Sequence, residues 1–186
     1  MLGFFKRLKS RRDAVAEDIV RLLEEETARC CALSAEELMA LSDEELLATV
    51  WVRTKKIADC FDTERRALDH FTEPQRIFYI VYYYWQEVYH EGLCCYFANT
   101  SRETALFLRE ALEMIGAKEH KNLFEDFLRE NKIATAALSV FAVSDAKALK
   151  KIERQYPFDD FNSAFYALTP MTEQVAAYVR ENIFVF

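Results

Sequence analysis

Turn-forming residues are scarce in this chain of 186 residues, which contains only three glycines and three prolines. A β-sandwich or β-barrel needs turn residues roughly every 8–12 positions along the chain. A phosphate-binding loop needs clustered glycines so that backbone N–H groups can approach the phosphate, whereas Gly3, Gly92 and Gly116 lie far apart. The sequence therefore excludes those folds and that kind of nucleotide site, and it favours helices.

Helix start signals recur along the chain, and apolar residues follow them at helical spacing. In a capping box, a Ser or Thr hydroxyl accepts one free backbone N–H while a Glu or Gln three positions later accepts another. Four pairs fit this scheme: Ser34 with Glu37, Ser42 with Glu45, Thr72 with Gln75, and Thr100 with Glu103. Pro170 suits the first turn of a last helix, and Gly116 suits a helix end. We predict a single compact all-α domain of roughly seven to nine helices.

Two segments need a decision between helix and strand. Residues 77–85 (IFYIVYYYW) are β-branched and aromatic, which favours a strand. The cap at Thr72 and the spacing of the apolar residues instead predict a helix from Thr72 to His90, apolar on most sides and therefore central. Its aromatic stripe is interpreted as core packing. Residues 133–143 (IATAALSVFAV) are apolar all round, and their alanines favour a second buried helix.

Charge divides the chain into a basic start and an acidic remainder. Residues 1–12 carry five basic side chains and no acid, which leaves 19 basic against 31 acidic side chains, a net charge of -12, over residues 13–186. We therefore expect a basic amphipathic arm, residues 1–12, on an acidic helical domain, residues 13–186. An acidic domain repels nucleic acid, so we expect a protein partner rather than direct nucleic-acid binding. A homodimer remains open.

The arm has two competing roles. Its apolar residues could dock on the acidic body, which we favour, or contact anionic lipid. These residues are Leu2, Phe4, Phe5 and Leu8. Because no apolar run reaches the ~18–20 residues of a membrane span, and the arm is too interrupted for a signal peptide, we do not expect membrane association. The five cysteines form no C-x-x-C pair, which indicates reduced thiols and a cytoplasmic protein.

Two groups of residues could form a metal site or a catalytic site, and both groups are incomplete. Glu87 and His90 form an E-x-x-H of the kind seen in di-iron bundles, but the second such motif is missing. His90 could also pair with Cys94 or Cys95 as an imidazole and a thiolate for nucleophilic catalysis. With three histidines and five cysteines, some proximity is expected by chance. We predict no catalytic, metal-binding or cofactor-binding residues, and no enzyme.

Clustered carboxylates are the remaining candidates for a binding surface. Rows of carboxylates on helices can approximate the spacing of phosphates along a nucleic-acid strand, although most charged runs are simply solvated helix faces. The candidates chosen for clustering are Glu36, Glu37, Asp43, Glu44, Glu110, Glu113, Asp159 and Asp160.

Three ordered blocks in about residues 73–186 resemble the signature of a known family. The first contains Glu87, Val88, Gly92, Tyr96, Phe97 and Asn99, the second is Ile115-Gly116-Ala117, and the third runs from the aromatic segment 158–166 to Tyr178-Val179-Arg180-Glu181-Asn182. The family comprises small acidic all-helical bacterial proteins, is classed as a domain of unknown function, and includes DNA-mimic proteins. The chain departs from its Asn-Asn-Gly pattern at Tyr89-His90-Glu91.

The resemblance implies a helical acidic protein that binds other proteins and has no catalytic residue. Our leading hypothesis is a non-enzymatic DNA mimic whose acidic face occupies the DNA site of a DNA-binding protein. The alternative is a helical interaction module without mimicry, of the antitoxin or immunity kind. A Cys/His or metal-dependent enzyme is the third and weakest hypothesis.

Overall fold

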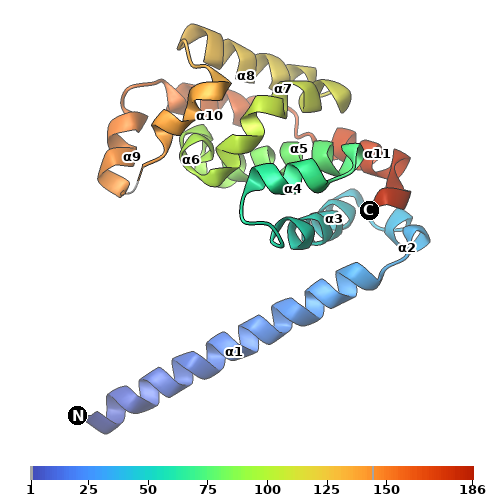
Figure 1. Ribbon diagram of the computed structural model, residues 1–186, viewed down its shortest axis with the longest axis vertical. Helices are drawn as coiled ribbons and strands as arrows, with labels where there is room; N and C mark the ends of the chain where they lie inside the picture. Colours follow the sequence, from blue (N-terminus) through green and yellow to red (C-terminus); the bar gives the residue numbers. More distant parts are fainter. Residues whose placement is uncertain (1, 144) are drawn as a thin grey trace.

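The computed structural model describes residues 2–143 and 145–186, and within that part of the chain it describes side chains from residue 17 onward. These residues form helices and no strand, which confirms the all-α prediction (Figure 1). The elements, in order, are α1 (Leu2–Ala32), α2 (Ala35–Met39), α3 (Asp43–Ala58), α4 (Glu64–His70), α5 (Glu73–Glu91), α6 (Leu93–Ala98), η1 (Thr100–Thr104), α7 (Ala105–Met114), α8 (Lys118–Glu130), η2 (Thr135–Phe141), α9 (Ala146–Glu153), α10 (Phe158–Ala167), α11 (Thr172–Glu181) and η3 (Ile183–Val185).

Helix α5 lies at the centre of the body, as its sequence predicts. It packs against α3, α6, α7 and α11. Phe78, Tyr79 and Tyr84 are fully buried, and their rings contact aromatic side chains of neighbouring elements. Burial on several sides explains why β-branched and aromatic residues form a helix here, because packing outweighs their intrinsic preference for strands.

The predicted caps are confirmed at three of the four positions. Complete capping boxes at Ser34 and Ser42 start α2 and α3, and the Thr72 cap starts α5. The fourth prediction, a box between Thr100 and Glu103, is wrong. The Glu103 carboxylate instead accepts a hydrogen bond from the Arg65 backbone N–H at 3.0 Å, so it caps the first turn of α4.

Two glycines end helices with the backbone geometry that only glycine adopts easily. Gly92, at φ +83°, separates α5 from α6, and Gly116, at φ +78°, follows α7. After Gly116 the Ala117 N–H donates to the Leu112 carbonyl oxygen at 2.9 Å, which satisfies a free carbonyl at the helix end. Gly116 therefore stops the helix as predicted.

Two expectations about the second half of the chain are wrong. The segment 133–143 is not a buried α-helix: it contains the 3-10 helix η2, which buries Leu138 and Phe141 while Val140 is 71% exposed. With three residues per turn, side chains three apart share a face, so only one edge of this segment enters the core. Pro170 does not open the last helix, because α11 begins at Thr172.

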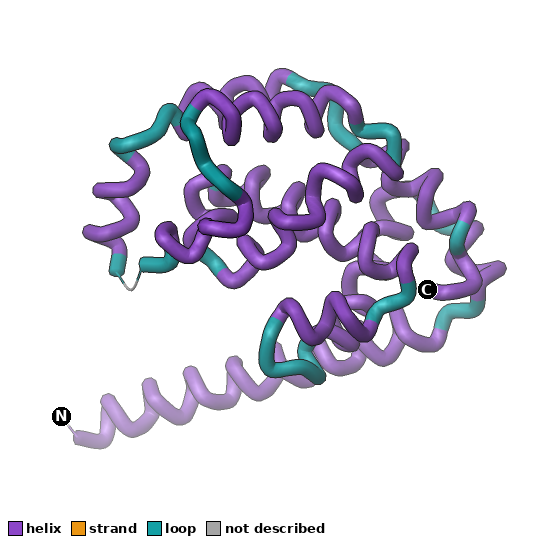
Figure 2. The backbone as a smooth tube through the Cα atoms, turned by 45° about the horizontal axis from the view of Figure 1, so that its top comes forward, coloured by secondary structure: helices purple, strands orange, loops and turns teal. Residues whose placement is uncertain are grey.

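Helix α1 runs without interruption from Leu2 to Ala32, across the expected boundary at residue 12. Figures 1 and 2 show it projecting from the body, with its C-terminal end beside α3. The docking of Leu2, Phe4, Phe5 and Leu8 concerns side chains outside those described, so the division into arm and body stays a prediction. Among the described residues, no helix combines the length and the hydropathy that crossing a membrane requires.

Candidate functional site

The signature residues around Gly92 hold the α5–α6 junction together. The Asn99 side-chain amide donates to the Glu87 carboxylate at 2.8 Å, which ties the end of α6 to the last turn of α5. Burial raises the pKa of Glu87 above its ordinary value. Val88 and Phe97 are fully buried. These contacts give the signature a role in folding.

Two further contacts complete the junction. The hydroxyl groups of Tyr96 and Thr104 are hydrogen-bonded at 2.6 Å, and both side chains are buried. From α10, the Asn162 side-chain oxygen accepts the Leu93 backbone N–H at 3.0 Å. A Cβ atom on Gly92 would lie 2.7 Å from Asn162 Nδ2, so a larger residue at this position would displace the Asn162 amide that accepts the Leu93 N–H.

The E-x-x-H pair does not form a site. Glu87 bonds to Asn99, whereas His90 Nε2 lies 3.2 Å from Gln86 Oε1 one turn earlier on α5. Among the described side chains, those of residues 17–143 and 145–186, no cluster of three or more His, Cys, Asp or Glu residues could hold a metal ion.

The adjacent thiols lie in surroundings that disfavour a thiolate. Burial raises the pKa of Cys94 to about 12, and burial with the nearby Glu91 and Glu87 raises the pKa of Cys95. Both cysteines are free. A nucleophilic cysteine needs the opposite shift, which a neighbouring cation or a helix N-terminus supplies. Cys94 and Cys95 do lie in the first turn of α6, but burial and nearby negative groups outweigh that position, and both pKa values are raised.

Four of the eight candidate carboxylates lie together, on the consecutive helices α2 and α3. Glu36 and Glu44 are exposed. Glu37 belongs to the Ser34 capping box, and Asp43 accepts a hydrogen bond from the Arg180 guanidinium of α11. The latter two carboxylates thus have structural partners, whereas the former two face solvent.

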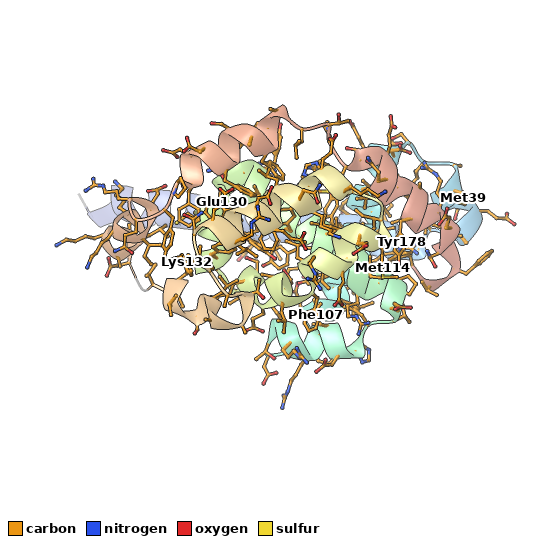
Figure 3. All side chains as sticks on the ribbon, turned by 90° about the horizontal axis from the view of Figure 1, so that it is seen from above. Met39, Phe107, Met114, Glu130, Lys132 and Tyr178 are labelled. Atoms are coloured by element: carbon orange, nitrogen blue, oxygen red, sulfur yellow. The ribbon has the colours of Figure 1, made fainter. Side chains whose placement is uncertain are left out.

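The other four candidates lie elsewhere on the body. On α7, Glu113 pairs with Lys121 at 2.9 Å, and Glu110 lines a hollow that also contains arginine and lysine side chains. Asp159 and Asp160 occupy the first turn of α10. Figure 1 shows α10 beginning near α9, away from α2, which Met39 marks at one end of the body in Figure 3.

Three carboxylates missed by the sequence analysis join the α2–α3 group. The carboxylates of Glu73 on α5 and Glu181 on α11 lie near Tyr178, whose pKa is raised by burial and by these two charges. Glu173 lies in the first turn of α11, which packs on α3 and α5. We call the exposed set the acidic end: Glu36, Glu37, Glu44, Glu73, Glu173 and Glu181.

The opposite end of the body carries a cluster of the opposite sign, which the sequence analysis also missed. Lys147, Lys150, Lys151 and Arg154 are exposed on and just after α9, and they line one shallow hollow. Figure 1 shows α9 far from α2 and α11. The missed signal was the i, i+3, i+4 and i+7 spacing of these cations, which places them on one helix face.

A pocket of about 410 Å³ opens where α5, α10 and the start of α11 meet α3. Aromatic side chains form much of its wall: Tyr82, Trp85, Tyr89, Phe165 and Tyr166. Glu44 of the acidic end also lines it, as do His90 and His120. Tyr89 and His90 are two of the positions at which the chain departs from the family pattern.

His120 is the buried polar residue of this pocket. It is 4% exposed, and its Nε2 lies 2.9 Å from the Thr169 carbonyl oxygen. Burial lowers the pKa of His120, so the ring is neutral at pH 7. A neutral ring that donates from Nε2 has an unprotonated Nδ1, and that atom has no hydrogen-bond partner among the described residues.

Comparison with known proteins identifies the family of this chain. Neither a curated protein nor a solved structure matches the sequence. A family model described as DMP19-like protein matches residues 69–182, which is more than half of the chain and includes α5 to α11. This span agrees with the resemblance noted over about residues 73–186, and it leaves α1, α2 and α3 outside. The chain belongs to the DMP19-like protein family.

Proposed function

We propose that this protein is a non-enzymatic interaction protein whose acidic end occupies the DNA-binding groove of a DNA-binding protein. The observation that carries the proposal is the gathering of exposed carboxylates from α2, α3, α5 and α11 at one end of the body. A basic groove that binds phosphates also attracts such a surface, because both present closely spaced negative charges.

Local charge balance distinguishes this end from other acidic parts of the surface. Elsewhere many carboxylates are neutralised by a neighbouring cation, as in the Arg109–Glu125 and Arg129–Asp126 pairs of the α7–α8 region. At the acidic end, Arg180 is engaged with Asp43 and the Leu41 carbonyl oxygen. The exposed carboxylates there keep their charge available for a partner.

A plain interaction module without mimicry is the second candidate, and the cations of α9 favour it. A DNA duplex is negative along its whole length, whereas this body is acidic at one end and basic at the other. A mimic would therefore use only the acidic end, while a partner of mixed charge could use both ends.

A competition assay separates these candidates. The partner is first recovered by pull-down from the native host, and the protein then competes with labelled DNA for it. The test variant combines Glu36→Gln, Glu44→Gln, Glu73→Gln and Glu173→Gln. The matched control combines Glu110→Gln, Glu113→Gln, Asp159→Asn and Asp160→Asn, which removes the same charge elsewhere. Glu37 and Asp43 are left unchanged because of their structural partners.

We expect the wild type and the control to displace DNA and the test variant to fail. Surface substitutions usually change stability by about 0.5 kcal/mol or less, so unfolding should not explain the loss. Equal displacement by all three proteins, or a partner that does not bind nucleic acid, would refute mimicry and leave the plain interaction module.

A further inference from the structure

We propose that the aromatic pocket between α3, α5 and α10 receives an arginine side chain of the partner protein. The identity of that partner rests on the proposed function, whereas the affinity of the pocket for a guanidinium group does not. Glu44 belongs both to the acidic end and to the pocket, so one docked surface would engage both.

The wall of the pocket suits a flat cation. Guanidinium groups stack on the faces of Trp and Tyr, where the ring electrons attract positive charge. Trp85 and Tyr82 of α5 contact each other edge to face at 5.5 Å, and Tyr89 meets Tyr166 of α10 in the same way at 5.9 Å. These contacts fix the rings before any ligand arrives, which reduces the entropy lost on binding.

A hydrogen bond holds one side of the wall in place. The Tyr166 hydroxyl donates to the Tyr89 carbonyl oxygen at 2.8 Å, which links α10 to the last turn of α5. Both of these tyrosine side chains nevertheless remain more than half exposed, at 54% and 55%. Large aromatic surfaces that stay open beside a cavity are characteristic of a binding site for a side chain.

The charge and hydrogen-bonding groups of the lining also select a cation with several donors. Glu44 is the carboxylate of the lining, and no lysine or arginine among the described residues lines the pocket. Gln86 offers a side-chain carbonyl oxygen beside the Glu44 carboxylate. An arginine brings five N–H donors in a plane, whereas a lysine brings a compact ammonium that stacks less well.

The apolar part of the lining provides a surface for the methylene groups of the arginine side chain. Leu47, Phe165, Leu168 and Pro170 contribute aliphatic and aromatic surface beside the polar groups. An arginine side chain carries three methylene groups that can bury against such surface while the guanidinium reaches the carboxylate. A volume of about 410 Å³ accommodates one side chain of this size.

The test uses full-length protein and two small probes of matched shape. Nα-acetyl-L-arginine amide carries the guanidinium, and Nα-acetyl-L-citrulline amide replaces it with a neutral urea. Binding is followed by NMR through the indole N–H signal of Trp85, and Trp51, which does not line the pocket but packs on Tyr82 of its wall, gives the signal for comparison. We expect a saturable shift at Trp85, a smaller one at Trp51, and binding of arginine about 10-fold tighter than that of citrulline.

Two variants and one control test the assignment of the lining. Glu44→Gln and Tyr89→Leu should each weaken arginine binding by about 3- to 10-fold, because one removes the charge and the other an aromatic face. Glu36→Gln, which removes a charge outside the pocket, should leave the affinity unchanged. Equal binding of the two probes, or no saturable shift at Trp85, would overturn the proposal.

The probe result is independent of the DNA competition result. If the wild type displaces DNA but Trp85 does not respond to arginine, the pocket proposal is wrong and the proposed function stands. If arginine binds as expected but DNA is not displaced, the pocket proposal stands and mimicry is wrong.

Discussion

The two longest helices, α1 and α5, differ in what stabilises them. In the described part of α1, residues 17–32, most side chains face solvent, and Leu22 and Leu23 are about 60% exposed. Only its end packs on α3, where Cys30 is buried and its carbonyl oxygen accepts a hydrogen bond from Arg53. The preceding turns are supported by local ion pairs such as Arg21–Asp18 and Arg29–Glu26. Helix α5 instead buries Phe78 completely.

This contrast shows two different routes to a helix. Ion pairs between exposed side chains contribute little because solvent screens them, so α1 depends on good helix-forming residues along its length. Helix α5 contains residues that favour strands, and its stability comes from the neighbours that pack around it. The family match follows the same division, since it includes α5 and leaves α1 outside.

The largest expected difference between the two helices comes from removing an apolar side chain from each. Phe78→Ala should destabilise the protein by about 3–5 kcal/mol, because it leaves a cavity among Tyr82, Phe186 and their neighbours. Leu22→Ala should change the free energy of unfolding by about 0.5 kcal/mol or less. Urea denaturation measures both, and similar losses would show that α1 is packed in solution.

A smaller effect concerns the glycine that ends α5. Gly92→Ala should cost about 1–3 kcal/mol, because the backbone has a positive φ and the new Cβ would meet Asn162. Gly116→Ala is the matched control: its φ is also positive, but none of the described atoms outside its own neighbourhood lies within 4 Å of the new Cβ. It should therefore cost less than Gly92→Ala in the same denaturation assay. Equal losses of unfolding free energy for the two variants would show that contact with Asn162 adds nothing to the cost of Gly92→Ala.

The smallest effect concerns the pH dependence of stability, to which a buried titratable group contributes more than an exposed one. Because burial lowers the pKa of His120, the folded protein keeps this ring neutral while the unfolded chain takes up a proton near pH 6.5. The stability linked to His120 is therefore complete above about pH 6.5 and is lost as the pH falls toward the lowered pKa. On α1, the exposed Glu26 has its pKa lowered by the Arg29 guanidinium, but solvent screens that pair.

His120→Gln keeps a donor for the Thr169 carbonyl oxygen and removes the titration. The loss of unfolding free energy between about pH 7.5 and 5.5 should be smaller in this variant than in the wild type. Burial raises the pKa of Glu87, so the contribution of Glu87 to the free energy of unfolding changes with pH in the opposite direction. This contribution cancels in the comparison because both proteins contain Glu87. An identical pH dependence of the two proteins would show that His120 ionises freely in the folded state.

Local sequence signals predicted the helices, and tertiary contacts explain where prediction stopped. Caps and spacing are short-range, so the starts of α2, α3 and α5 could be predicted. Glu103 could not be assigned, because its partner Arg65 lies 38 residues away in the sequence. The segment 133–143 was misjudged because its all-round apolar character gives no periodicity, and the 3-10 geometry appears only when Leu138 and Phe141 enter the core.

The candidate site was predicted only in part, for the same reason. Clustering along the sequence found Glu36 and Glu44, but it could not bring Glu73 of α5 and Glu173 of α11 to the same end of the body. The pocket combines residues from 44 to 172, and a single aromatic side chain gives no sign in the sequence of whether it lines a cavity or fills the core.

The central claim, that the acidic end carries partner binding, is tested most directly by the salt dependence of the complex. The association constant with the recovered DNA-binding partner is measured by titration calorimetry between about 50 and 200 mM salt, a range in which screening between exposed charges increases strongly. We expect a steep decrease, about 10-fold or more, for the wild type and for the control altered at Glu110, Glu113, Asp159 and Asp160. The variant altered at Glu36, Glu44, Glu73 and Glu173 should bind weakly at every salt concentration and show a shallow slope. Identical slopes for all three proteins would contradict the account.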